Sequence, residues 1–189
     1  MKTYPFAIVV TVDADRPMAT HIPIEIREHN GKIYALGHIA YGNPHKKTLA
    51  TPAPVLLIFQ GPHTYISSSW YEAENVPTWD YLAVHAYGTS RLMAGAERET
   101  YFASLLRRYE SHREKGRLWE TYTEGFLQDQ MQGIVAFEIE ITAIHGAGKL
   151  SQNRNDRDYQ AIVSALENLS DEDAHRVAQW MRHHRPHVF

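Results

Sequence analysis

Residues 18–39 read MATHIPIEIREHNGKIYALGHI, and this stretch carries the clearest fold signals of the chain. From Met18 to Ile26 the β-branched residues recur at every second position, which is typical of a strand with one buried face. The dipeptide Asn30-Gly31 is the strongest short signal for a tight hairpin turn. The return strand is predicted from Lys32 to Ile39. The stretch therefore predicts two antiparallel strands joined by a hairpin.

Further strands are predicted on both sides of this hairpin, at residues 6–12, 55–60, 63–66, 84–93 and 133–145. Gly61-Pro62 is interpreted as a turn, and Gly146 to Lys149 as a turn after the last strand. Helical periodicity comes late, at residues 97–113 and 156–169. A capping box of Ser170 and Asp173 opens a final helix that runs to about Arg182. Many short strands with appended helices predict a mainly β fold, an antiparallel barrel rather than a parallel α/β sheet.

Composition limits the class of protein. The chain has 189 residues, of which 43% are hydrophobic and 22% charged, so residues 1–189 are expected to form a single domain with C-terminal helices from about 155. The net charge of -3 argues against a strongly basic nucleic-acid surface. The absence of cysteine excludes disulfides and thiol catalysis. No apolar run reaches the roughly 18 residues of a membrane span, and a cytoplasmic location is expected.

Polar residues gather near the ends of consecutive predicted strands. His38 lies near the end of one strand, and Asn43, Lys46 and Lys47 follow where that strand gives way to a short helix. Two lysines beside free backbone N–H groups at a helix N-terminus suit a phosphate group, and His38 could add a donor. A solvated lysine pair is the competing interpretation, and the residues alone leave the two about equal.

An aromatic block runs from Phe59 to Tyr71 and continues through residues 76–81 and 83–88. Rings with interleaved hydroxyl and imidazole groups can enclose a planar ligand, although an aromatic cluster is more often ordinary core. The run from Lys149 to Arg154 adds amide and guanidinium groups just after a strand. By itself this run would be an ordinary polar loop.

Taken in order, these segments resemble the PaiB family, a branch of the FMN-binding split-barrel proteins. The likeness extends from Tyr4-Pro5-Phe6 to the Lys149–Arg154 run and so covers nearly the whole chain. It implies an antiparallel split β-barrel of the FMN-binding type, a homodimer with the flavin at the subunit interface, and FMN as the cofactor. Family members are named as negative transcriptional regulators.

The resemblance also implies positions for the cofactor-binding residues. Thr20, His21 and Ile22 would line the edge of the isoalloxazine ring, largely through backbone groups. The phosphate and ribityl chain would be held by His38, Asn43, Lys46 and Lys47. Trp70 would close the face of the ring, and Gln152, Asn153 and Arg154 could reach across from the partner subunit. The sequence departs from the family after Asn43-Pro44, where an aromatic residue and an arginine are common and His45-Lys46-Lys47 stands here.

Two functions from different classes remain open at this stage. One is an FMN-dependent oxidoreductase, for which no residue stands out as an obligatory acid or base. The other is a flavin-binding regulator that acts on DNA or through a protein partner. The nearest basic candidates for DNA are Arg107-Arg108 and His112-Arg113 on the predicted helix, with Arg182 to Arg185 near the end of the chain, but no helix-turn-helix is recognisable. The histidines would also permit haem, although nothing selects it. No metal site is expected.

Overall fold

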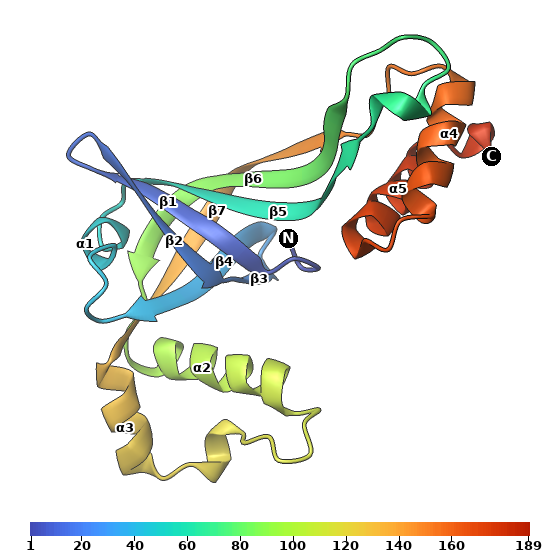
Figure 1. Cartoon of the computed structure of the whole chain (residues 1–189). Coiled ribbons are helices and arrows are strands. Elements are labelled where there is room, and N and C mark those ends of the chain that lie inside the picture. Colours follow the sequence, from blue (N-terminus) through green and yellow to red (C-terminus); the bar gives the residue numbers. More distant parts are fainter. The chain divides into compact units, whose positions relative to one another are not determined.

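The computed structural model describes residues 1–189 and groups them into two compact units (Figure 1). The first unit holds residues 1–59 and 85–144, and the second unit holds residues 60–84 and 145–189. Three long strands run through both units, namely β5 (Pro54–Ile66), β6 (Thr78–Leu92) and β7 (Ile134–Lys149). Because the two units share these strands, the division does not test the expected single domain. The single domain stays a prediction.

All strands belong to one seven-stranded sheet with the order β2-β1-β5-β6-β7-β4-β3. The four shorter strands are β1 (Phe6–Asp13), β2 (Arg16–Pro23), β3 (Glu25–His29) and β4 (Lys32–Ala40). Strand pairing is antiparallel from β2 through β1 to β5, and again from β3 through β4 to β7. The sheet does not close, because β2 and β3 are both edge strands. This arrangement confirms the predicted antiparallel split-barrel class.

The prediction of one continuous strand from Met18 to Ile26 is wrong, because the chain forms two strands there. β2 pairs with β1, whereas β3 pairs with β4, so the two strands lie at opposite edges of the sheet order. Ile24 separates them, with a side chain only 2% exposed and a backbone N–H that donates to Pro5 O at 2.8 Å. The sequence still alternates across this point, because the side chain of Ile24 remains buried while the strand partner changes from β1 to β4.

Both hairpins of the first unit use tight two-residue turns. Asn30 and Gly31 have φ values of 50° and 73°, and their flanking residues His29 and Lys32 pair in register, as the sequence predicts. A second turn of this kind joins β1 to β2 at residues 14–15, where both φ values are again positive. Such turns match the natural twist of paired strands, so they set the register of each hairpin.

Neither glycine segment predicted as a turn in the second unit is one. β5 continues through Gly61 and Pro62, and β7 continues to Lys149. A side chain at Gly61 would lie 2.9 Å from Leu82 O, so the glycine permits a close approach to the neighbouring strand β6. The Gly-Pro pair therefore marks tight strand contact and not a reversal of the chain.

Three α-helices belong to the first unit: α1 (Lys46–Leu49), α2 (Gly95–Glu110) and α3 (Glu124–Gln132). The sequence analysis did not foresee α3. Tyr101 and Phe102 of α2 are buried in a core that includes Leu36 and Ala136 of the sheet. No helix is long and apolar enough to cross a membrane.

The second unit contains α4 (Asp156–Glu167) and α5 (Glu172–His184), which pack against each other (Figure 1). Their shared core is an apolar cluster that also includes Ile66 and Tyr71. The cap of α5 is Asp171, whose side chain accepts from Asp173 N, so the predicted capping box from Ser170 is wrong. The carboxylate of Asp171, one residue after Ser170, accepts the hydrogen bond from a free N–H group at the start of the helix.

Candidate functional site

The edge strand β2 offers unpaired backbone groups at one of the expected flavin-binding residues. In an antiparallel hairpin, only every second residue exchanges hydrogen bonds with the neighbouring strand. The bond from Ile24 N to Pro5 O places the even-numbered positions, including Thr20 and Ile22, in that bonded set. The backbone N–H and C=O groups of His21 therefore face the open edge of the sheet. Among the three expected residues, His21 alone presents its backbone to a ligand at this edge.

The side chains of these residues point in different directions. Ile22 is 2% exposed and belongs to the core. His21 lies on the surface and stacks on Phe6, with ring centroids 6.1 Å apart. The hydroxyl of Thr20 lies 2.9 Å from Nδ1 of His45. Thr20 thus enters a polar cluster that the sequence analysis did not identify.

His45 is the centre of this polar cluster and is fully buried. Its Nε2 lies 2.7 Å from Thr11 Oγ1, and Thr11 Oγ1 in turn lies 2.7 Å from Thr48 Oγ1. Thr48 also donates to His45 O at 3.0 Å. Both ring nitrogens therefore have partners, and the imidazole ties α1 to β1 and β2. The sequence signal that could have identified His45 was its position directly after Asn43-Pro44, where the chain departs from the family pattern.

Burial lowers the pKa of His45 from its usual 6.5, so the folded protein favours the neutral ring. The unfolded chain takes up a proton below about pH 6.5, whereas the folded chain resists it. Stability should therefore be fully present above that pH and fall as the pH drops. We expect the loss in melting temperature between about pH 7.5 and 5.5 to be smaller in His45→Gln than in the wild type. Equal losses in thermal melts of the two proteins would contradict this role.

The first turn of α1 does not offer the free N–H groups that were expected to bind phosphate. His45 N donates to Asn43 Oδ1 at 2.9 Å, and Lys46 N donates to Asn43 O at 3.1 Å. Lys47 N donates to Pro44 O at 3.1 Å. The backbone of this junction is satisfied internally, because the turn after β4 folds back on itself. Any anion here would have to bind to the lysine side chains.

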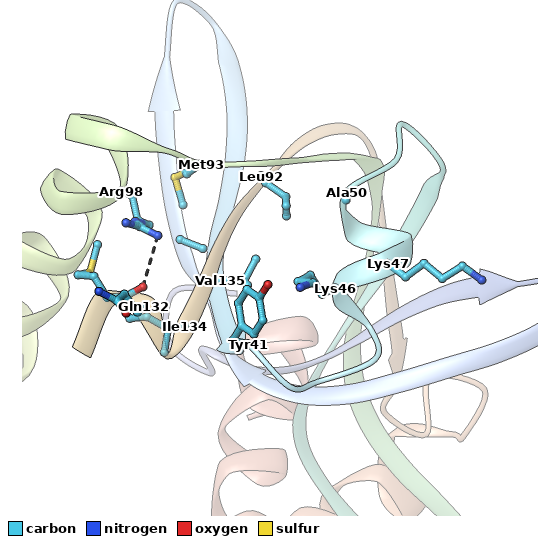
Figure 2. A pocket seen from close by; sticks show the side chains of 12 residues that line it. Tyr41, Lys46, Lys47, Ala50, Leu92, Met93, Arg98, Gln132, Ile134 and Val135 are labelled. Carbon is cyan, nitrogen blue, oxygen red and sulfur yellow. Dashed lines mark hydrogen bonds between the residues drawn. The ribbon is translucent and has the colours of Figure 1, made fainter. Parts of the chain in front are cut away.

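The two lysines differ in where their ammonium groups lie (Figure 2). Lys46 Nζ sits over the ring of Tyr41, 3.6 Å from its centroid, on the wall of a cavity of about 650 Å³. Lys47 contributes to the same wall, but its side chain extends away from the cavity and its Nζ lies 2.9 Å from Asp13 Oδ1. Lys46 is therefore the better placed of the two cations.

The opposite side of this cavity is mainly apolar, and its two polar side chains are those of Arg98 and Gln132. Leu92, Met93, Ile134 and Val135 line it, together with Arg98 (Figure 2). Arg98 donates to a backbone carbonyl of α3, but its buried Nε has no hydrogen-bond partner. A mostly apolar cavity of several hundred Å³ with a few polar groups is typical of a site for a planar organic ligand. The ammonium group of Lys46 fits a ligand with an anionic part.

His38 does not join this group. Its Nδ1 lies 3.1 Å from the hydroxyl of Tyr101, and its ring makes an edge contact with Phe102 at a centroid distance of 5.0 Å. Burial lowers the pKa of His38, which favours the neutral ring in this apolar setting. His38 thus fixes α2 to β4. This placement gives no support to a role in phosphate binding.

The four remaining expected residues lie in the second unit. Trp70 packs against the core of α4 and α5. Gln152 accepts from Leu150 N at 2.9 Å and donates to Gly148 O at 2.8 Å, so its side chain shapes its own loop. Arg154 lies over the ring of Tyr71, 4.5 Å from the centroid, and Asn153 is exposed. Gln152 and Arg154 thus make contacts within their own chain.

Two of the aromatic and polar sequence blocks meet at a buried carboxylate in the second unit. Asp80 is fully buried and accepts from Ser151 Oγ at 2.7 Å, while its Oδ1 has no partner. Burial raises the pKa of Asp80, and the hydrogen bond from Ser151 and the charges of Lys149 and Arg154 oppose that rise. Residues 76–81 and the Lys149–Arg154 run therefore converge in space within the second unit.

Comparison with known proteins places these features in a family. Residues 1–143 match the family described as "Putative FMN-binding domain". The chain belongs to this family. The chain is also similar to "Protease synthase and sporulation protein PAI 2" of Bacillus subtilis. The two sequences are 42% identical over 93% of this chain and 85% of that protein. This similarity confirms the resemblance to the PaiB family.

Solved structures with the same fold are more distant in sequence. The FAD and heme binding protein from Mycobacterium smegmatis has a TM-score of 0.52 at 19% identity, covering 84% of this chain and 73% of that one. The flavocytochrome Anf3 from Azotobacter vinelandii has a TM-score of 0.53 at 13% identity, covering 77% of this chain and 62% of that one. At these sequence identities, the structural similarity shows that this chain shares their fold and nothing further.

Proposed function

We propose that this protein binds FMN in the cavity beside α1 and uses the bound flavin for electron transfer. The observation that carries the proposal is the cavity itself, in a chain of the FMN-binding family. Its wall combines an ammonium group over a tyrosine ring with a buried guanidinium N–H that lacks a partner. The ammonium group of Lys46 suits the phosphate of a planar cofactor, and the apolar part of the wall suits its ring.

The residues of the first unit take distinct roles in this proposal. Lys46 holds the phosphate by charge, and Asn43 maintains the turn that positions Lys46. The outward backbone groups of His21 bind the polar edge of a ring, provided that the ring reaches the edge of β2. Lys47 acts through its ion pair with Asp13, which fixes α1 to the β1–β2 hairpin. The flavin supplies the redox chemistry, and the protein binds and orients it.

A spectral titration tests the proposal directly. We expect purified protein, with or without added FMN, to show flavin absorbance that remains after gel filtration, and FMN to bind more tightly than riboflavin. Reduction of the bound flavin by NADPH under anaerobic conditions would support electron transfer. Protein that retains no flavin after incubation with excess FMN would overturn the proposal.

A regulatory function is the second candidate, and the name of the Bacillus subtilis relative favours it. Regulation through direct DNA contact would need cations free to meet phosphates. Arg107 pairs with Glu120, and Arg113 of the following turn lies 3.6 Å from Glu110. These pairs make regulation through a protein partner or through flavin state the better form of this candidate. A mobility-shift assay on duplex DNA at low salt separates the two forms.

We also propose a homodimer, because the family resemblance implies one and the edge strand β2 offers unpaired backbone groups to a second copy of the chain. Light scattering of the FMN-loaded protein measures the mass directly. A mass of one chain, 21.7 kDa, with flavin still bound would separate cofactor binding from dimerisation.

A further inference from the structure

The second unit contains a cavity of about 510 Å³, and its lining residues include none of the proposed FMN residues of the first unit. Its walls come from β5, β6 and the start of α5. His63 and Tyr65 stand two positions apart on β5 and therefore share one face of the strand. Trp79 of β6 lies beside both of them, and Trp70 completes the aromatic lining.

The aromatic rings of this cavity contact one another and remain partly exposed to solvent. Tyr65 and Trp79 meet edge to face, with centroids 6.0 Å apart and an interplanar angle of 69°. His63 lies against Trp79 at a centroid distance of 6.2 Å. Trp79 is 55% exposed and Tyr65 46% exposed, so their ring faces remain open to solvent. Large aromatic surfaces held open beside polar groups are typical of a binding site.

Two carboxylates share the cavity with these rings. Asp171 and Asp173 both line it, and Glu172 between them belongs to the first turn of α5. Asp173 Oδ2 lies 3.6 Å from His63 Nδ1, which carries a charge only when protonated. Arg176 of α5 pairs with Glu172 and lies 4.0 Å from Asp173, and the helix N-terminus adds roughly half an elementary positive charge. Three carboxylates still exceed one guanidinium and this partial charge, so the sum stays negative. The local charge therefore favours a cation and repels a phosphate.

We propose that this cavity binds the alkylated ammonium group of a small organic cation. Ring faces attract cations electrostatically, and a carboxylate nearby adds to the attraction. A metal ion fits poorly, because no group of three metal-ligating side chains is present and hard cations require several oxygen ligands. The inference is independent of the FMN proposal, since none of its residues belongs to the cavity beside α1.

Calorimetric titration of the full-length protein with choline tests this inference. The matched ligand is the alcohol in which a carbon atom replaces the nitrogen of choline, since it has the same shape without the charge. We expect choline to bind at least about tenfold more tightly than this alcohol. Equal affinities would show a merely apolar hollow and would overturn the proposal, as would the absence of choline binding at millimolar concentrations.

Two variants test the location of the site, and a third variant serves as a control. Trp79→Leu should weaken choline binding about tenfold, and Asp173→Asn should weaken it severalfold. Trp180→Leu removes another half-exposed tryptophan, one that contacts His183 and does not line the cavity, and should leave the affinity unchanged. Circular dichroism confirms folding of each variant. Choline binding that survives both cavity substitutions would place the site elsewhere and overturn the assignment.

Discussion

Replacing Lys46 by methionine is expected to weaken FMN binding about thirtyfold while leaving riboflavin binding almost unchanged. The ammonium group lies on the cavity wall, held over Tyr41, and the backbone N–H groups of α1 are already used. The side chain therefore carries the attraction for phosphate that the helix terminus does not supply. Methionine keeps much of the length and the apolar contact of the side chain and removes only the charge. Quenching of flavin fluorescence during titration measures both affinities.

Lys47→Met is the matched control for this experiment. It removes the same charge one residue further along, from a side chain that is paired with Asp13 and directed away from the cavity. We expect less than about a threefold loss of FMN affinity from this change. Equal losses for FMN and riboflavin in Lys46→Met would show that the residue supports the fold of the site and does not bind phosphate.

Replacing Gly88 by alanine is expected to destabilise the protein by about 3 kcal/mol or more. A Cβ atom at this position of β6 would lie 2.1 Å from Glu140 O and 2.8 Å from Ile139 Cγ2, both on β7. The nearest atom belongs to the backbone, so it cannot move aside without distorting the pairing of two adjacent strands. The midpoint of urea unfolding measures the loss.

Gly146→Ala provides the comparison for this prediction. Gly146 also lies in a strand, β7, but a Cβ atom added there would meet nothing within 4 Å. We expect its effect to stay within about 0.5 kcal/mol. If the two substitutions cost the same, the close approach at Gly88 would not be the reason that glycine is needed there.

The class of fold was predictable from sequence because strand alternation and hairpin turns are local signals. Asn30 and Gly31 adopt the positive φ values that their residue types favour, and the register of that hairpin follows. The exchange of partners at Ile24 was not predictable in this way. It depends on which strand lies on each side of the chain, and the alternating pattern is the same for one strand or two.

The candidate site was predicted less completely than the fold. The junction at Asn43 and Lys46 was identified, and it does border a cavity. The roles of His38 and of the backbone N–H groups depended on distances across the sheet and within a turn, which residue types do not reveal. His45 was overlooked because a buried histidine with two threonine partners looks, in sequence, like any polar residue beside a lysine pair.

The sharing of β5, β6 and β7 by the two units has a consequence for how the chain can be divided. Residues 1–143, which match the family model, stop within β7 and omit α4 and α5. Such a fragment would keep Ile66 and Tyr71 while deleting the helices that bury them. Neither unit is a contiguous stretch of sequence, so a chimaera with a relative must exchange two segments together.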